Sequence, residues 1–340
     1  MNPLLSIVMP VFNGTEELKT MIDSVLDNSY QDWELLAVDD GSNDETKNVL
    51  KTYATRDRRI HFIERNRAPK GAQTCRNIGL ETAQGEYIVF FDSDDYIAPY
   101  CLEQRVKELS EHPELDFMVF RSGTYYNNAF HQEPNKFNYG YQIYNDDIEA
   151  FCSRTLPFIV WNNIFRRSSL LKYGISWDTH LLSLQDAQFN LECILSGMRY
   201  AYCAFAPDYG YRTAGTDSVS KKIHSAAHFE SNLYATKRFY TLIHQSYGQR
   251  YDRALYRGAM SLYVTVSRTG FHKDFNRRLA SLIQSFSPLW GTVFRWQMRL
   301  TCLLYKILPL IPARRLPIPN YLLWYCRMEQ QMVKRQKKLL

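Results

Sequence analysis

The sequence has few cysteines, and none of them stands in a metal-binding or disulfide-framework pattern. It contains seven Cys in 340 residues. They are Cys75, Cys101, Cys152, Cys193, Cys203, Cys302 and Cys326. An odd count without Cys-x-x-Cys spacing argues against a zinc site and against a fold held together by disulfides. We therefore expect a protein of a reducing compartment.

A long apolar run and a targeting leader are also missing from the sequence. The stretch LTCLLYKILPLIP at 300–312 is too short to span a bilayer, and it contains Lys306 and two prolines. The N-terminal stretch MNPLLSIVMPVF has no basic leader and no small-residue cleavage site. These absences predict a cytoplasmic protein without a transmembrane helix.

Acidic residues are scarce in the last third of the chain, although the net charge of the whole sequence is only +6. Residues 221–340 contain 21 Lys and Arg against four Asp and Glu, whereas residues 1–220 have a net charge of −11. Basic residues interleaved with Trp, Tyr and Leu, as in 294–315, are typical of helices that lie on anionic membranes. A helical cap with solvated charges explains the pattern equally well. We expect no nucleic-acid partner.

The chain does have a regular alternation of apolar runs and helical patterns. Apolar, β-rich runs occur at 5–12, 33–40, 59–65, 86–92 and 116–120. Between them, apolar residues at helical spacing predict helices, the first with Thr15 as its cap. This alternation predicts an α/β fold with a mostly parallel sheet and helices on both faces. Polar clusters follow the strands, at the edge where open α/β sheets bind ligands. Beyond 225 the pattern is helical.

Residues 89–95, VFFDSDD, place three carboxylates directly behind the fourth predicted strand. Crowded carboxylates resist ionising together. A hard cation such as Mg²⁺ or Mn²⁺ relieves that repulsion and leaves coordination positions for water and phosphate. A turn followed by a helix start is the simpler interpretation, since Asp favours both. Aspartyl phosphatases also place Asp-x-Asp after a strand, so this motif alone does not define a reaction.

Two other polar groups belong to the same predicted edge of the sheet. Asp39 and Asp40 follow the second strand, where a carboxylate can accept the N–H of a uracil ring or a ribose hydroxyl. Arg76 lies early in a helix, where the guanidinium and the helix N-terminus both favour phosphate. A tight connection and a solvated Arg are the simpler interpretations of these residues.

Four motifs in this order and spacing closely resemble the nucleotide-sugar-binding half of family 2 glycosyltransferases, which have the GT-A fold. They are SIVMPVFNG, LLAVDDGSND, GAQTCRNIGL and GEYIVFFDSDD. The resemblance resumes at WNNIFRRSSLL, LSLQDAQFNLECILSG and YGYRTAGTDSVS, which look like the acceptor half. It implies a nucleotide-sugar-binding half at 1–112 and an acceptor-binding half of the same GT-A domain at 113–224. A basic, helical C-terminal region is expected at 225–340.

The resemblance also implies roles for individual residues around the donor. The implied donor-binding residues are Pro10, Val11, Asn13, Asp39, Asp40, Arg76, Asp92 and Arg212. In that set Asp40 would contact the uracil, Asp92 would lie on the ribose side and Arg212 would approach the leaving diphosphate. Asp94 would ligate a divalent metal, Mn²⁺ or Mg²⁺, that bridges the diphosphate.

Asp186 falls where the resemblance places the family's catalytic base, which usually belongs to a Glu-Asp pair. Here Gln185 replaces the preceding acid. Trp161 would face the acceptor sugar, although a buried core Trp is an equal alternative. One displacement with one base implies inversion, and hence a β-linkage from an α-linked donor. The Gln-x-x-Arg-Trp motif of the processive members is missing, so we expect an enzyme that adds a single sugar.

The expected activity is sugar transfer from a nucleotide-diphosphate donor, above all a UDP-sugar, to a glycan or lipid-linked hydroxyl in cell-surface polysaccharide synthesis. One rival is a sugar-phosphate nucleotidyltransferase, which should have a Gly-rich loop with Lys or Arg after the first strand. This chain has PVFNGTEEL there. A second rival is a non-catalytic module that keeps the nucleotide pocket, and Gln185 gives that interpretation some weight.

Overall fold

The computed structural model describes residues 3–213, 225–267, 273–307 and 336, and these group into two compact units. In the described part of the chain, the first unit contains 3–142 and 156–213. The second contains Ile143–Thr155 and the helices from 225 onward. The segment 143–155, expected in the acceptor half, therefore groups with the C-terminal helices. The assignment of 1–112 to donor binding and of 113–224 to acceptor binding remains a prediction.

A seven-stranded sheet forms the centre of the first unit, in the order β10-β6-β9-β4-β1-β2-β3. Its strands are β1 (Leu5–Val11), β2 (Trp33–Asp39), β3 (Ile60–Glu64), β4 (Tyr87–Phe90), β6 (Phe117–Val119), β9 (Asn163–Arg166) and β10 (Tyr200–Tyr202). Neighbours pair in parallel except β9, which runs antiparallel to β4 and to β6. The five predicted strands are thus confirmed. Their ends differ from the predicted ends by at most two residues.

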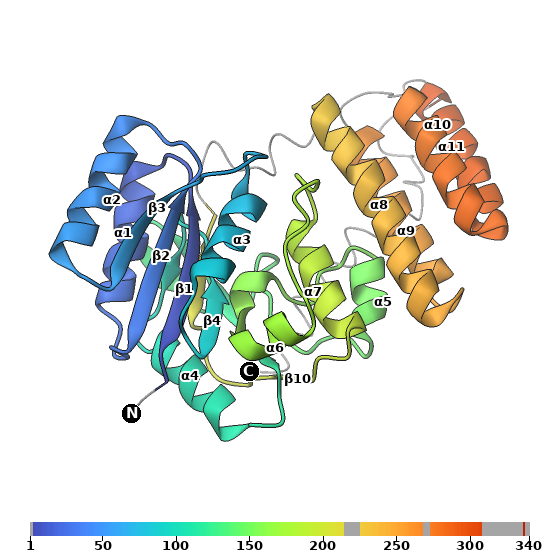
Figure 1. The fold of residues 1–340 in the computed structure, drawn as a ribbon. Helices are drawn as coiled ribbons and strands as arrows, with labels where there is room; N and C mark the ends of the chain where they lie inside the picture. The colour runs from blue at the N-terminus through green and yellow to red at the C-terminus, as the bar shows by residue number, and fades with distance from the viewer. Residues whose placement is uncertain (1–2, 214–224, 268–272, 308–335, 337–340) are drawn as a thin grey trace. The chain divides into compact units, whose positions relative to one another are not determined.

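Helices cover both faces of this sheet, as predicted. They are α1 (Thr15–Leu26), α2 (Asp44–Arg56), α3 (Ala72–Thr82), α4 (Cys101–Glu111), α6 (Arg167–Lys172) and α7 (Gln185–Leu195), with a 3₁₀ turn at Val160–Asn162. Figure 1 shows α1 and α2 on one side of β1–β3 and α3 on the other. The expected cap of the first helix is wrong in detail. Gly14 is the N-cap of α1 and makes no side-chain bond, and Thr15 is the first helical residue.

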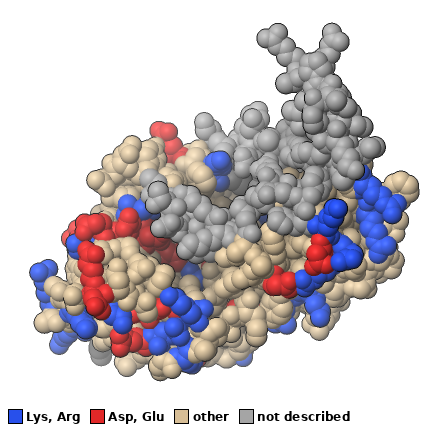
Figure 2. Space-filling view, turned by 90° about the horizontal axis from the view of Figure 1, so that it is seen from above, with Lys and Arg blue, Asp and Glu red and all other residues tan. Residues whose placement is uncertain are grey.

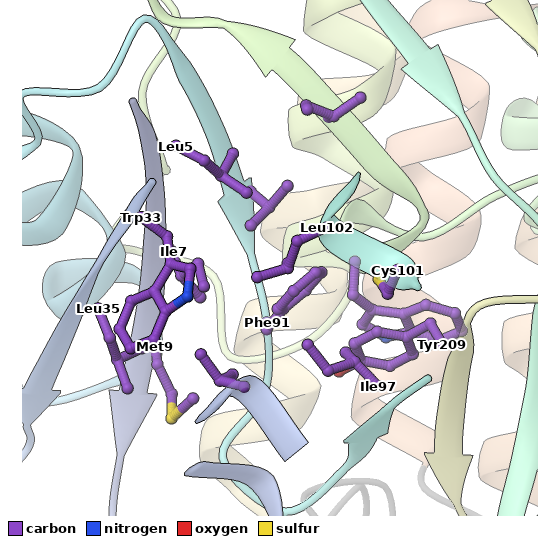
Figure 3. Close-up of a cluster of buried hydrophobic side chains, with 14 of the residues drawn as sticks. Leu5, Ile7, Met9, Trp33, Leu35, Phe91, Ile97, Cys101, Leu102 and Tyr209 are labelled. Carbon is purple, nitrogen blue, oxygen red and sulfur yellow. The ribbon is translucent and has the colours of Figure 1, made fainter. Parts of the chain in front are cut away.

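The core of the first unit explains why its strands are apolar along their whole length. Every residue of β1 and β2 is buried, because helices pack on both faces of the sheet. Figure 3 shows side chains from β1 and β2 in one cluster with Phe91, Ile97, Leu102 and Tyr209. The five cysteines that the structure describes in full are buried free thiols.

A small second sheet lies in the same unit and follows the order β5-β11-β7-β8. Its strands are β5 (Tyr96–Ile97), β7 (Ser122–Tyr126), β8 (Ala129–His131) and β11 (Tyr209–Arg212). The pairing of β11 with β5 is antiparallel, and Tyr209 stands opposite Ile97. This pairing brings the end of β11 next to the carboxylates that precede β5.

The second unit is helical, as the sequence predicts. It contains α5 (Asp147–Cys152), α8 (Ala226–Tyr247), α9 (Asp252–Ser267), α10 (Lys273–Phe286) and α11 (Pro288–Ile307). None of the helices in the described ranges combines the length and the apolar character needed to cross a membrane.

Candidate active site

Three strands of the main sheet end side by side. In the parallel register Val11 of β1 stands opposite Asp39 of β2, and Val8 of β1 stands opposite Phe90 of β4. The polar residues that follow each strand therefore meet at one edge of the sheet. This is the edge at which open α/β sheets bind ligands.

The two carboxylates after β2 point into the protein. Asp39 accepts hydrogen bonds from the backbone N–H groups of Gly41 and Ser42, each at 3.1 Å. Asp40 Oδ1 accepts from Arg65 Nε at 2.7 Å and from the Gly71 N–H at 3.0 Å. Asp39 thus builds the turn, and Asp40 is paired with an arginine that the sequence analysis did not single out.

The loop after β1 is held by the loop after β2. The Asn13 N–H donates to Ser42 Oγ at 2.9 Å, and Asn13 Oδ1 accepts from the Asn43 N–H at 3.0 Å. Asn13 has a φ of 58°, a left-handed conformation that Asn tolerates better than most residues. Pro10 and Val11 are buried in β1 beneath this loop.

An exposed aromatic ring in the same loop was missed by the sequence analysis. Phe12 is exposed between buried Val11 and the ordered Asn13. The ammonium of Lys70 lies 3.6 Å from the centroid of the Phe12 ring. A large apolar ring exposed at this edge offers a surface on which a flat ligand could stack. The signal in the sequence was an aromatic residue placed after a buried strand and before Asn-Gly.

The three carboxylates after β4 have different surroundings. Asp95 is buried, accepting from the Tyr209 hydroxyl at 2.7 Å and from the Arg212 N–H at 2.7 Å. Asp92 is half-buried and pairs with Arg76, and Asp94 is open to solvent. The cluster therefore combines one carboxylate that organises β11 with two that face the sheet edge.

Crowding changes the acidity of this cluster in the expected direction. Desolvation by the surrounding protein, followed by the charge of Asp92, raises the pKa of Asp94 to about 6, even though solvent reaches its side chain. Burial, and then the charges of Asp94 and Asp92, raise the pKa of Asp95 well above its usual range. A positive group at this edge would therefore be stabilised by the cluster.

Arg212 supplies a positive group beside Asp94. Its Nε donates to the backbone carbonyl of Asp94, and its guanidinium lies 4.8 Å from the centroid of the Tyr125 ring. Its Nη2 is buried and has no hydrogen-bond partner among the residues described. An oriented guanidinium with an unused donor is suited to a phosphate oxygen.

Arg76 lies on the inner side of the site and connects two elements. Its Nη2 donates to Asp92 Oδ1 at 2.6 Å, and its Nη1 donates to Gln185 Oε1 at 3.2 Å. The side chain is buried against Trp177, with 4.5 Å between the guanidinium and the ring centroid. Arg76 thereby ties the end of β4 to the start of α7.

Asp186 occupies the first turn of α7. The helix follows Leu184, which has φ 60° and makes no side-chain cap bond. Asp186 Oδ1 is buried and has no hydrogen-bond partner in the described part of the chain. Burial raises the pKa of Asp186 to about 6, although Arg76 acts in the opposite direction. Burial therefore outweighs the charge of Arg76, and the group is a carboxylate with a basicity suited to proton transfer near neutral pH.

Trp161 lies in the core rather than at the site surface. It is 3% exposed and stacks on Tyr209 with 4.7 Å between ring centroids. Tyr211 lies beside it at 5.9 Å. The burial and the stacked tyrosines agree with the buried-core alternative, and a contact of Trp161 with an acceptor sugar stays a prediction.

The resemblance implies a divalent metal, Mn²⁺ or Mg²⁺, at this edge of the sheet. No group of three or more His, Cys, Asp or Glu side chains within the described ranges could hold a metal ion. An exposed Asp94 does fit a hard cation, because Mg²⁺ is commonly held by one or two carboxylates together with substrate phosphates.

The fold and this edge define a class: an α/β protein whose carboxylates and arginines converge on the sheet edge where open α/β sheets bind ligands. Residues 6–174 match the family model described as Glycosyl transferase family 2. The chain therefore carries a family 2 glycosyltransferase domain, and the resemblance inferred from its motifs is confirmed.

Two relatives and one solved structure agree with this assignment. The chain is 41% identical over 125 residues to an uncharacterized glycosyltransferase of Haemophilus influenzae, covering 36% of this chain and 47% of that protein. It is 27% identical over 258 residues to the poly(ribitol-phosphate) beta-N-acetylglucosaminyltransferase TarP of Staphylococcus aureus, covering 74% of each. The crystal structure of S. aureus TarS 1–349 in complex with UDP-GlcNAc has a TM-score of 0.66 at 19% identity. It covers 84% of this chain and 82% of that chain.

The chain shares its fold with TarS, but it matches only part of the length of several relatives. The TarS likeness confirms the predicted fold class. The chain spans 47%, 44% and 58% of the length of three curated relatives that it matches. The activity of the whole protein is therefore a matter of proposal.

Proposed function

We propose that this protein is an inverting, metal-dependent glycosyltransferase. It would move a sugar from a nucleotide-diphosphate donor, above all a UDP-sugar, to a hydroxyl of a glycan or lipid-linked acceptor in cell-surface polysaccharide synthesis. The observation that carries the proposal is the buried, unpartnered oxygen of Asp186, set in the same unit as Asp94 and Arg212. The glycosyltransferase names of the relatives, and the UDP-GlcNAc bound to TarS, support the substrate class.

The nucleoside would bind at the ends of β1 and β2. Arg65 and the Gly71 N–H fix the Asp40 carboxylate in place. Asp40 would then accept a hydrogen bond from an N–H of the base. Phe12 would supply an apolar face for the ring, a role suited to an exposed aromatic. Asn13 and Asp39 would act by holding the two loops in position rather than by direct contact.

The diphosphate would lie between Asp94 and Arg212. Negative charge builds on this leaving group as the bond to the sugar breaks, and a divalent ion held by Asp94 supplies Lewis-acid stabilisation there. The unused Nη2 of Arg212 would donate to a phosphate oxygen. Asp94 lies in the loop between β4 and β5, and Arg212 ends β11, the strand that pairs with β5. The two groups could therefore act on the same phosphates.

Asp186 would take the proton from the attacking acceptor hydroxyl. The proton would go to the Asp186 carboxylate, whose side chain is 27% exposed. Arg76 lies 3.7 Å away and keeps the carboxylate from becoming too basic to stay ionised. One base and one displacement invert the anomeric carbon. The beta-linked products named for TarP and for a poly(ribitol-phosphate) beta-glucosyltransferase support this stereochemistry.

The acceptor would be presented at the cytoplasmic face of a membrane. The last third of the sequence carries a net charge of +17 from residue 221 onward, and such a charge attracts anionic lipid surfaces. A lipid-linked saccharide would then diffuse to the site in two dimensions.

The test is release of UDP from UDP-sugars with Mn²⁺, measured with and without candidate acceptors. Transfer to an acceptor, with the product bond of β configuration, is the expected result. Nucleotide-sugar synthesis from a sugar phosphate and a nucleoside triphosphate would instead identify a nucleotidyltransferase. Tight UDP-sugar binding without turnover on any acceptor would identify a binding module, and metal-dependent hydrolysis of simple phosphate esters a phosphatase.

A further inference from the structure

The outer face of α11 exposes a row of large apolar side chains. Leu289 is 70% exposed, Trp296 is 66% exposed and Leu300 is 56% exposed. Their spacings of seven and four residues place all three on one side of an α-helix. Single exposed apolar residues are ordinary, but an aligned row that includes a Trp indicates a contact surface. We call these three residues the α11 outer row.

The opposite side of α11 is already occupied by the other helices of its unit. Phe294 is buried, and its ring lies 5.9 Å from Tyr263 of α9 in an edge contact. Gly291 is packed so closely that a Cβ there would lie 2.5 Å from Cα of Gln284 in α10. Because these contacts fix the rotation of α11, the outer row cannot turn inward without breaking them.

The charged residues of α11 itself are all basic. The sequence of α11, PLWGTVFRWQMRLTCLLYKI, contains three basic residues and no acidic residue. Arg295 and Arg299 are both exposed, and the Arg299 guanidinium lies 5.9 Å from the centroid of the Trp296 ring. In the view of Figure 2, Lys and Arg side chains lie beside Asp and Glu side chains on both the left and the right half of the molecule.

We propose that the α11 outer row is a docking surface for an anionic phospholipid bilayer. Leu289 and Leu300 would enter the boundary between headgroups and acyl chains, and Trp296 would sit at the headgroup level, where indole rings are enriched. Arg295 and Arg299 would contact lipid phosphates at the edge of the row. The helix would lie along the surface of the bilayer.

The charge pattern favours lipid over the two alternative occupants. Residues 308–340 of this chain contain seven Lys and Arg and one Glu, so covering the row with that segment would bring like charges together. A second copy of α11 would do the same, because it has no acidic residue to offer. An anionic surface removes the repulsion in both cases.

The experiment is flotation of the full-length protein with vesicles, which does not depend on the proposed transferase activity. Vesicles of phosphatidylcholine alone and of phosphatidylcholine with phosphatidylglycerol are compared at low and high salt. We expect flotation with the phosphatidylglycerol vesicles at low salt and little with phosphatidylcholine alone. A wild-type protein that stays at the bottom of the gradient with every vesicle overturns the proposal and leaves the donor chemistry untouched.

Matched variants assign the binding to the outer row. Leu300→Glu and Trp296→Glu should each lower the bound fraction roughly 10- to 100-fold, because each removes an inserted apolar side chain. The control is Leu171→Glu on α6, since Leu171 is 54% exposed in the other unit. Equal flotation of Leu300→Glu and Leu171→Glu overturns the assignment. So does a wild-type dimer, measured by sedimentation, that dissociates on Leu300→Glu while no protein floats.

Discussion

Asp186 Oδ1 lies 3.7 Å from Nη1 of Arg76, yet the carboxyl oxygen has no hydrogen-bond partner among the residues that the structure describes. The other amino group of the same guanidinium is bonded to Asp92 at 2.6 Å. The positive charge is therefore close enough to hold Asp186 in its ionised form without occupying the lone pairs of Oδ1. This arrangement is suited to a general base, and it makes Asp186 the first residue to test.

Replacing Asp186 by Asn removes the proton acceptor and keeps the size of the side chain. If Asp186 is the base, transfer should fall by roughly 10²–10⁴-fold while UDP-sugar binding is unchanged. Turnover and donor affinity are measured separately, by product formation and by calorimetry. Glu192→Gln, two turns further along α7, is the control and should keep wild-type transfer. Wild-type rates in the Asn variant would show that the proton goes elsewhere.

The pH dependence of transfer follows from the same carboxylate. Burial raises the pKa of Asp186 to about 6, and only the ionised form can accept a proton. As the pH falls through 6 the base becomes protonated, so transfer at saturating donor and metal should fall about tenfold per pH unit below that point. Above pH 7 the rate should level off. A rate that stays flat down to pH 4.5 would contradict the role of Asp186.

Five strands of the main sheet could be predicted from the sequence because each is a continuous apolar run, whereas the order of the strands in the sheet could not. That pattern also placed Asp40 and Asp94 at one edge of the sheet, whereas Asp186 was added by the resemblance to the family. Side-chain direction was harder to foresee. Whether Asp39 faces a ligand or bonds to its own turn, as it does through Gly41, depends on a few degrees of backbone rotation that composition does not encode.

Contacts between residues far apart in the sequence could not be predicted either. The burial of Trp161 is decided by Tyr209, which stacks on it from a strand nearly fifty residues later. The partner of Asp40, Arg65, lies on the far side of α2 in the sequence. Such pairs are set by tertiary packing, which periodicity within one element cannot report.

Asp94→Asn tests the metal site. The amide keeps the shape but is a much weaker ligand for a hard cation, so Mn²⁺-dependent transfer should fall by at least about 10²-fold. Affinity for UDP in the presence of Mn²⁺ should fall as well, and affinity without metal should change little. Because Asp94 is open to solvent, the melting temperature should match that of Asp44→Asn, an exposed control on α2. Near-normal turnover at low Mn²⁺ would remove Asp94 from the metal site.

Tyr209→Phe tests the support beneath the carboxylate cluster. The Tyr209 hydroxyl donates to Asp95 Oδ2 at 2.7 Å and accepts from the Asp92 N–H at 3.2 Å. Removing it leaves a buried carboxyl oxygen and a backbone donor without this partner, which should lower the free energy of unfolding by about 1–3 kcal/mol.

The same substitution should also lower transfer by displacing Arg212, because Asp95 accepts a hydrogen bond from the Arg212 N–H at 2.7 Å. Transfer should therefore weaken more than donor binding does. Urea unfolding and kinetics are compared with Tyr211→Phe, which removes a hydroxyl from the same strand outside this network and should change stability by less than about 0.5 kcal/mol. If both variants unfold at the same urea concentration as the wild type, Asp95 is satisfied by other groups, and Tyr209 is only a packing residue against Trp161.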